Sequence, residues 1–399
     1  MRAGWVKKHL GEVCESKLGK TLNASTDHGE IRPYLCAVNV KWDAFDLATI
    51  KKAPFDADEI KKYSVQKGDL LVCEGGETGR AAIWDKEEPI QYQNALHRIR
   101  FKEGTILPRF CLHYLRYLKL SGVLDKEYSH GATILHLVSK SLYSIPIEYP
   151  SLPEQQRIVD ILDREFAKID ALKANAEKSL QAANDLFQAT TDTMMSNGQW
   201  RELTIGEIAK IKGGKRVPKG YKLEKEPTAH RYIRVADFTD LGTIRTESVL
   251  YISDEVYKSI KAYTISSKDV YISIAGTIGK SGIIPDTLDG ANLTENACKL
   301  VLGPNFYNRF VFFATKTSSF KKQVETLTMQ AAQPKLALTR LATIRVRVPS
   351  SIKEQETIVE RLDGIADTIA LLQENYQKTL SLCDDLKQSL LRKAFNGEL

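Results

Sequence analysis

The sequence predicts an α+β protein with an internal pseudo-twofold repeat: two similar, strand-rich globular domains joined by two long helices that pair as an antiparallel coiled coil. Three observations predict this fold. A series of landmark residues returns about 195 to 200 positions later, each copy changes once from short apolar runs to a long heptad-like stretch, and the same helix-start signal stands at both changes.

The repeat is defined by residues that keep their order in both copies, which begin near Trp5 and Trp200. We interpret these two tryptophans as core anchors rather than as base-stacking residues. The other landmarks are Lys17, Gly19, Lys20, Asp69, Gly76, Gly79, Arg80 and Asn94 in the first copy, and Lys212, Gly214, Lys215, Asp269, Gly276, Gly279, Lys280 and Asn296 in the second. A repeat of this length predicts two similar domains, not a short-period solenoid.

Short apolar runs bounded by Gly and Asp, such as residues 70–73 and 270–274, predict strands in each globular part. The change to helix-like periodicity follows Pro150 and Pro349. The predicted divisions are therefore residues 1–152 and 198–350 for the two globular domains, and residues 153–197 and 351–399 for the two helical regions.

Each helical region begins with an S-x-x-E sequence, at 151–154 and 351–354, which predicts a capping box. Apolar residues then recur in steps of three and four, a pattern typical of a coiled-coil seam. The seam residues that we predict are Ile158, Leu162, Ile169, Leu172 and Leu186 in the first helix, and Ile358, Leu362, Ile369, Leu372 and Leu386 in the second. The alternative is that each helix packs on its own domain.

Composition narrows the classes of function. Lys and Arg exceed Asp and Glu by 57 to 50, a net charge of +7, which favours a polyanionic partner without demonstrating one. The six cysteines show no CxxC spacing and the seven histidines no metal-ligand spacing, so no disulfide framework and no metal site is predicted. The absence of a signal segment and of a long apolar run predicts a cytoplasmic protein with no membrane partner.

The segment Gly276–Ser281 resembles the end of a P-loop, but the motif requires a glycine where Ile274 stands, and the first copy has Arg80-Ala81 in place of Lys-Ser. A glycine-rich turn between strands is the better interpretation. With no catalytic constellation found, the chain is predicted to bind rather than to catalyse.

The motifs together resemble a type I restriction-modification specificity (S) subunit. They are the Glu-Gln helix starts followed by Ile-Val and Leu-Asp at 154–163 and 354–363, the paired Gly-x-x-Gly-Arg/Lys loops, and the ending 391–399. The resemblance implies two target recognition domains, a non-catalytic chain without a cofactor of its own, and double-stranded DNA as a partner. It also implies two methyltransferase (modification) subunits, which use S-adenosylmethionine to methylate adenine at N6, and two restriction (motor and nuclease) subunits, which use ATP and Mg.

The candidate DNA-binding residues are basic side chains near glycine-rich turns, suited to phosphate contact, and polar side chains suited to base edges. They are Lys20, Gly76, Glu77, Thr78, Gly79, Arg80, Asn94, His97 and Arg98 in the first copy, and Lys212, Lys215, Arg216, Lys219, Gly276, Thr277, Gly279, Lys280, Asn296 and Lys335 in the second.

The copies differ between their shared landmarks; Lys20-Thr21-Leu22-Asn23, for example, stands against Lys215-Arg216-Val217-Pro218. Two similar frames with different side chains predict an asymmetric bipartite DNA site with a gap of unread base pairs. Two other classes of protein stay open at this point, a duplicated self-contained enzyme and a scaffold that joins two proteins without binding DNA.

Overall fold

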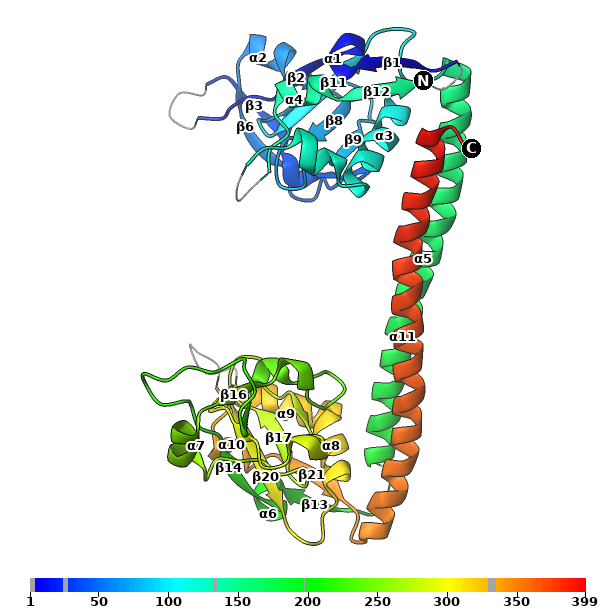
Figure 1. Cartoon of the computed structure of the whole chain (residues 1–399). Coiled ribbons are helices and arrows are strands. Elements are labelled where there is room, and N and C mark those ends of the chain that lie inside the picture. Colours follow the sequence, from blue (N-terminus) through cyan, green and yellow to red (C-terminus); the bar gives the residue numbers. More distant parts are fainter. Residues whose placement is uncertain (1–3, 24–27, 132–134, 197, 329–334) are drawn as a thin grey trace. The chain divides into compact units, whose positions relative to one another are not determined.

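The computed structural model describes residues 4–23, 28–131, 135–196, 198–328 and 335–399 (Figure 1). The chain divides into two compact units, Met1–Ala176 with Gln377–Leu399 and Glu177–Tyr376. Each unit contains one globular domain and a part of each long helix, because the division crosses both helices.

Unit 1 consists of a strand-rich domain, the first part of α5, which follows the domain in the chain, and the last part of α11. Its domain contains β1 (Val6–His9), α1 (Leu10–Val13), β2 (Cys14–Leu18), β3 (Glu30–Leu35), η1 (Ala37–Asn39), β4 (Val40–Lys41), β5 (Ala44–Phe45), β6 (Lys51–Phe55), α2 (Ala57–Lys62), β7 (Ser64–Val65), β8 (Leu70–Cys73), β9 (Ala81–Ile83), β10 (Ile90–Tyr92), β11 (Leu96–Phe101), α3 (Pro108–Leu120), η2 (Leu124–Tyr128), α4 (Ser139–Ser144) and β12 (Pro146–Tyr149).

Unit 2 repeats this order with fewer short elements. Its domain contains β13 (Arg201–Thr204), α6 (Ile205–Ile208), β14 (Ala209–Gly213), β15 (His230–Ile233), η3 (Val235–Asp237), η4 (Thr246–Ser248), β16 (Leu250–Ile252), α7 (Asp254–Ile260), β17 (Val270–Ser273), β18 (Ser281–Gly282), η5 (Asp286–Leu288), β19 (Asn292–Leu293), β20 (Ala297–Leu302), α8 (Asn308–Lys316), α9 (Ser318–Thr328), α10 (Leu338–Leu341) and β21 (Arg345–Val348).

Most of the sheet topology is shared by the two units, although strand β7 and the pair β4-β5 of unit 1 have no counterpart among the described strands of unit 2. The four-stranded sheet β2-β11-β8-β9 corresponds to β14-β20-β17-β18, the pair β1-β12 to β13-β21, and the order β6-β3-β10 to β16-β15-β19. The corresponding parallel contacts, β3 with β10 and β15 with β19, occur within otherwise antiparallel sheets. The predicted fold class, α+β with an internal repeat, is therefore confirmed.

The long helices are α5 (Leu152–Ser196) and α11 (Ile352–Asn396), and they run antiparallel within each unit (Figure 1). In unit 1, Lys173 Nζ lies 3.0 Å from Asp384 Oδ1, and Lys387 contacts Asp170. In unit 2, Gln373 Nε2 donates to Asn184 Oδ1 at 2.8 Å. The predicted antiparallel pairing is confirmed, and polar side chains take part in it.

The observed helix seam differs from the predicted one at three leucines. Ile158, Leu162, Ile169, Leu362 and Ile369 are buried, and Ile358 and Leu372 are partly buried. Leu172, Leu186 and Leu386, however, are 51%, 64% and 50% exposed, so their assignment to the seam is wrong. The seam instead passes through the residue that follows each of these leucines, namely Lys173, Phe187 and Lys387. The three- and four-residue spacing of seam positions is kept at these residues, although two of them are lysines.

The ends of the helices also belong to the cores of the domains. The core of unit 1 includes Ile158, Leu162 and Phe166 of α5 with Leu391 and Phe395 of α11, packed against strands and α3. In unit 2, Met195 of α5 and Leu362 of α11 pack in the same way against α8 and its sheet. Packing of a helix on its domain and pairing of the two helices are therefore not alternatives, since both occur.

A buried glutamine joins each long helix to the globular domain. Gln155 has no exposed surface, and its Oε1 accepts from Leu107 N at 2.9 Å while its Nε2 donates to Thr105 O and Pro150 O, both at 2.9 Å. Gln355 makes the corresponding bonds, with Tyr307 N at 2.9 Å, Asn305 O at 3.1 Å and Pro349 O at 3.3 Å. The side chain satisfies three backbone groups at the base of each helix, which explains why both helix starts share a glutamine at this position.

An arginine-aspartate pair fixes each helix two turns further on. Arg109 of α3 binds Asp163 of α5, with Nε 2.9 Å from Oδ2, and Arg309 of α8 binds Asp363 of α11, with Nη2 2.6 Å from Oδ1. Burial alone would raise the pKa of Asp163, but hydrogen bonds from His113 and Arg109 outweigh it and lower the pKa to about 2. We call each set, Gln155 with Arg109–Asp163 and Gln355 with Arg309–Asp363, a helix clamp.

The glutamates next to the clamps do not act as the predicted capping boxes require. Glu154 accepts from the Arg157 guanidinium, and Glu354 Oε1 accepts from the Trp200 indole at 2.9 Å. The helices begin at the expected place, but the first-turn carboxylate of α5 binds an arginine of the same helix and that of α11 binds a tryptophan of the domain.

We predict that Gln355→Ala destabilises unit 2, because it leaves the buried amide of Tyr307 and two carbonyl groups without their partner. The expected loss in the free energy of unfolding is on the order of 2–3 kcal/mol. Differential scanning calorimetry of the full chain measures it. Gln156→Ala, at an exposed glutamine beside the first clamp, is the matched control and is expected to change stability by no more than about 0.5 kcal/mol. Equal effects of the two variants would contradict the clamp.

Candidate nucleic-acid interface

The two glycine-rich loops, between β8 and β9 and between β17 and β18, are tight turns whose amides bind the protein itself. Gly79 N donates to Cys73 O and Gly279 N to Ser273 O, both at 2.9 Å. Gly76, Gly79, Gly276 and Gly279 all have φ between 75° and 86°, a region that strongly favours glycine. The interpretation as turns rather than nucleotide-binding loops fits this geometry.

Side chains of the first loop are directed into the domain. Thr78 is 1% exposed, and its hydroxyl donates to Asp125 at 2.7 Å. Arg80 donates to Ala37 O at 2.8 Å and to Glu77 Oε2 at 3.1 Å, while Glu77 Oε1 accepts from Trp42 at 2.7 Å. With its side chain 18% exposed, Arg80 has little surface left for a phosphate contact.

Three further candidates in unit 1 are buried, so the structure contradicts their assignment to the interface. Lys20 is 4% exposed and binds Glu59 at 2.7 Å and Pro54 O at 3.0 Å. His97 has no exposed surface, and its Nε2 lies 2.9 Å from Leu137 O. Arg98 is 9% exposed and donates to the carbonyl of Ser64. Their polar groups satisfy backbone and side-chain partners inside the domain.

The remaining loop candidates are more accessible. Thr277 and Lys335 are exposed, and Asn94 and Asn296 are partly buried. Asn94 donates to Thr21 Oγ1 at 3.2 Å, whereas Asn296 accepts from Ile274 N at 2.8 Å through its backbone carbonyl. Lys280, 22% exposed, lies 2.8 Å from Asp240.

Four exposed cations follow one another at the end of β14 and in the loop after it: Lys212, Lys215, Arg216 and Lys219. Arg216 Nε lies 2.5 Å from Glu295 Oε1 but is 77% exposed, and Lys215 Nζ lies 5.7 Å from the centre of the Tyr263 ring. This segment, the basic edge, is the group of predicted residues that the structure brings together at the surface of unit 2.

Strand register places two cations opposite each other at the corresponding position of each unit. Lys17 of β2 lies directly opposite Arg98 of β11, and Lys212 of β14 lies directly opposite Lys299 of β20. Burial, followed by the nearby charges of Lys62 and Arg98, lowers the pKa of Lys17. Like charges opposite each other weaken a sheet, but one member of each pair has a partner inside its own domain, since Arg98 donates to Ser64 O and Lys299 Nζ lies 3.0 Å from Asp269 Oδ2. The member exposed in unit 2 is Lys212, which belongs to the basic edge. The signal in the sequence was the Lys17 and Lys212 landmark pair.

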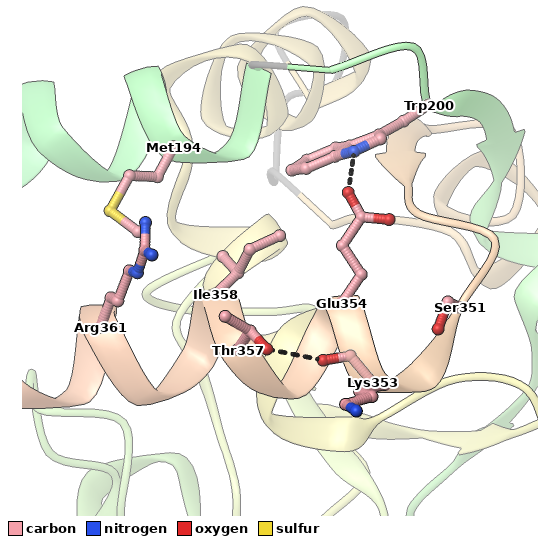
Figure 2. A pocket seen from close by; sticks show the side chains of 8 residues that line it. All are labelled: Met194, Trp200, Ser351, Lys353, Glu354, Thr357, Ile358 and Arg361. Carbon is pink, nitrogen blue, oxygen red and sulfur yellow. Dashed lines mark hydrogen bonds between the residues drawn. The ribbon is translucent and has the colours of Figure 1, made fainter.

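The tryptophan landmarks are core anchors, as interpreted. Trp5 and Trp200 lie against Phe110 and Phe310, with ring centres 6.3 Å and 5.9 Å apart. Figure 2 shows Trp200 above Glu354, in an open cavity of about 610 Å³ that Met194 of α5 and Arg361 of α11 also line. The Trp200 indole N–H donates to Glu354, so this ring links the globular domain to the start of α11.

Within the described residues, no group of three or more His, Cys, Asp or Glu side chains is placed to hold a metal ion. In the same part of the chain, no helix has both the length and the apolar character that crossing a membrane requires.

In each unit a strand-rich domain is held by a helix clamp to an antiparallel helix pair, and this duplicated arrangement defines a class of protein. Comparison with known sequences identifies the class. A sequence model described as the type I restriction modification DNA specificity domain matches residues 2–182 and again residues 197–380. The chain therefore belongs to the type I restriction-modification specificity subunits, which provide DNA specificity and are not themselves catalytic.

Individual relatives agree with this assignment. The EcoBI specificity subunit of Escherichia coli is 24% identical over 377 residues, covering 84% of this chain and 75% of that protein. The EcoDI specificity subunit, also from Escherichia coli, is 23% identical over 429 residues, covering 99% and 88%. Among solved structures, a chain from a study of complex assembly and conformational transition of the type I R-M system has a TM-score of 0.79, at 18% identity and with 99% and 98% coverage. The HsdS subunit of Thermoanaerobacter tengcongensis has a TM-score of 0.54, at 17% identity and with 100% and 98% coverage.

Proposed function

We propose that this chain reads an asymmetric, bipartite site on double-stranded DNA, one half-site with each globular domain. Bound there, it positions two adenine-N6 methyltransferase subunits and two ATP-dependent restriction subunits. The observation that carries the proposal is that the two units share sheets and helix clamps but differ at their exposed positions. A shared frame with unlike side chains suits a reader of two different sequences.

The corresponding surfaces illustrate the difference. Where unit 2 has four exposed cations between 212 and 219, the matching segment of unit 1 has a partly buried Lys17 and a buried Lys20, followed by Thr21 and Leu22. Phosphate contacts at the basic edge would hold the DNA, and the polar side chains nearby, such as Thr277, would reach base edges. On this proposal the basic edge contributes more phosphate contacts than the corresponding segment of unit 1.

The helix pair provides surface for the catalytic partners. Three exposed leucines, Leu172, Leu186 and Leu386, lie outside the seam. Two further leucines of α11, Leu371 and Leu382, are also exposed, at 59% and 65%. Exposed apolar side chains that lie together mark protein-binding surfaces, and Leu382 and Leu386, four residues apart on α11, share one face of that helix. We assign them to the methyltransferase subunits.

We predict that Lys212→Ala lowers the salt dependence of DNA binding, because one fewer counterion is displaced. The slope of log K against log salt is expected to fall by about 0.9 in magnitude. Arg80→Ala is the control: its side chain is bound to Ala37 O and Glu77, so its slope should match that of the unaltered chain. The measurement is a fluorescence-anisotropy titration of the assembly with its methyltransferase subunits at several salt concentrations. Equal slopes for Lys212→Ala and the unaltered chain would remove Lys212 from the interface.

We also predict that the double substitution Leu382→Asn and Leu386→Asn prevents assembly with methyltransferase subunits while leaving the fold intact, because both side chains are exposed. Analytical ultracentrifugation of the mixed subunits measures assembly, and circular dichroism checks the fold. Leu241→Asn, at a leucine that is 62% exposed outside the helix pair, is the control and should assemble normally. Normal assembly of the double variant would show that partners bind elsewhere.

A further inference from the structure

Unit 2 contains a cavity of about 1040 Å³ whose lining combines phenylalanine rings with lysine amines. It lies among the loop after β17, helices α8 and α9, and the parts of α5 and α11 that belong to this unit. Phe312, Phe313 and Phe320 supply the rings, and Lys280, Lys316 and Lys321 supply the amines. Of this lining, the proposed DNA-binding function uses Thr277 but none of the phenylalanine rings and not Lys316.

The corresponding place in unit 1 is filled by the chain's own indole ring. Arg309–Asp363 and Arg109–Asp163 occupy the same position in the two clamps, so Lys316, seven residues after Arg309, corresponds to Arg116. Asp240, three residues after η3, corresponds in the same way to Trp42, three residues after η1.

In unit 1 the Arg116 guanidinium lies 5.7 Å from the centre of the Trp42 ring and 5.1 Å from that of Phe166. The Trp42 indole donates to Glu77 at 2.7 Å, which fixes the ring in place. The space left over is a cavity of about 410 Å³. A cation and two aromatic rings thus pack together in unit 1. Unit 2 retains the cation as Lys316 but has Asp240 and Ala366 in place of Trp42 and Phe166, and its ring beside the cation, Phe312, stands where unit 1 has Leu112.

The lining of the unit 2 cavity carries four cations, Lys280, Arg309, Lys316 and Lys321, and two acids, Asp240 and Glu325, so positive charge is in excess. Lys316 Nζ donates to Ser281 O at 3.1 Å and lies 5.0 Å from the centre of the Phe312 ring, but within the described part of the chain no carboxylate forms a salt bridge with it. Asp240, the nearby acid, pairs with Lys280 at 2.8 Å while its side chain is 99% exposed. Burial, reinforced by the charge of Lys321, lowers the pKa of Lys316 to about 8.

These features identify the chemistry of an occupant. A planar aromatic ring would pack against Phe312 beside the Lys316 amine, as the Trp42 ring packs beside the Arg116 guanidinium in unit 1, and a negative group would accept from the amines and balance their charge. We propose that the cavity binds a small anionic ligand with a heteroaromatic ring, of the nucleoside monophosphate class. Its ring lies against Phe312, and its phosphate faces Lys280 and Lys316.

The probe is adenosine monophosphate, titrated into the full-length chain by isothermal calorimetry, with inorganic phosphate and adenosine titrated separately. Adenosine monophosphate is expected to bind at one site per chain and more tightly than either fragment. Asp240→Trp places an indole where unit 1 has Trp42, and Lys316→Met removes the buried amine. Each is expected to weaken binding at least about tenfold, the effect of losing a well-made charged or aromatic contact.

Asp240→Trp distinguishes binding in the cavity from non-specific binding to the basic surface. The substitution removes a negative charge, so it would strengthen non-specific attraction for phosphate while it fills the cavity. Glu247→Trp, an exposed acid-to-indole change outside the cavity lining, is the matched control and should bind as the unaltered chain does. No binding of adenosine monophosphate, equal binding of inorganic phosphate, or undiminished binding by Asp240→Trp would each overturn the proposal. DNA binding is measured independently, so failure here leaves the proposed function standing.

Discussion

Every other feature of this structure depends on the helix clamp, in which one buried glutamine satisfies three backbone groups at the base of a long helix. The glutamine fixes where α5 and α11 leave their domains, and the Arg109–Asp163 and Arg309–Asp363 pairs fix their rotation. Because unsatisfied backbone groups in a core are costly, the junction tolerates little change. Each domain is thereby held to the helix pair with the same geometry in both copies of the repeat.

A fixed junction leaves the rest of each domain free to differ. The cores and most of the sheet order of the two units correspond, while the basic edge of unit 2 differs from the matching segment of unit 1, where Lys17 is partly buried and Lys20 is buried. The same freedom extends to the interior, where the indole of Trp42 fills a place that remains a cavity beside Asp240. The repeat thus separates residues that maintain the frame from residues that select what the frame binds.

The fold could be predicted from the sequence because the repeated landmarks and the heptad spacing are both visible directly in the order of the residues. The predicted helix seam was wrong at Leu172, Leu186 and Leu386 because a lysine or phenylalanine, not a leucine, keeps the three-four alternation there. The assignment of Lys20, His97 and Arg98 to the DNA interface was wrong, because burial of a polar side chain depends on partners that are distant in sequence. Those partners are Glu59, Leu137 and Ser64. The opposed cations Lys17 and Arg98 required the strand register, which no single stretch of sequence contains.

The central claim, that two unlike surfaces on one frame read two unlike half-sites, is tested most directly by mapping methylated adenines. Single-molecule sequencing of DNA from cells that carry this chain with its methyltransferase subunits, as the only methylating system, gives the recognised motif. The account predicts one asymmetric motif made of two different specified parts, separated by unspecified base pairs of fixed number. A palindromic motif, or a continuous one without a gap, would contradict it.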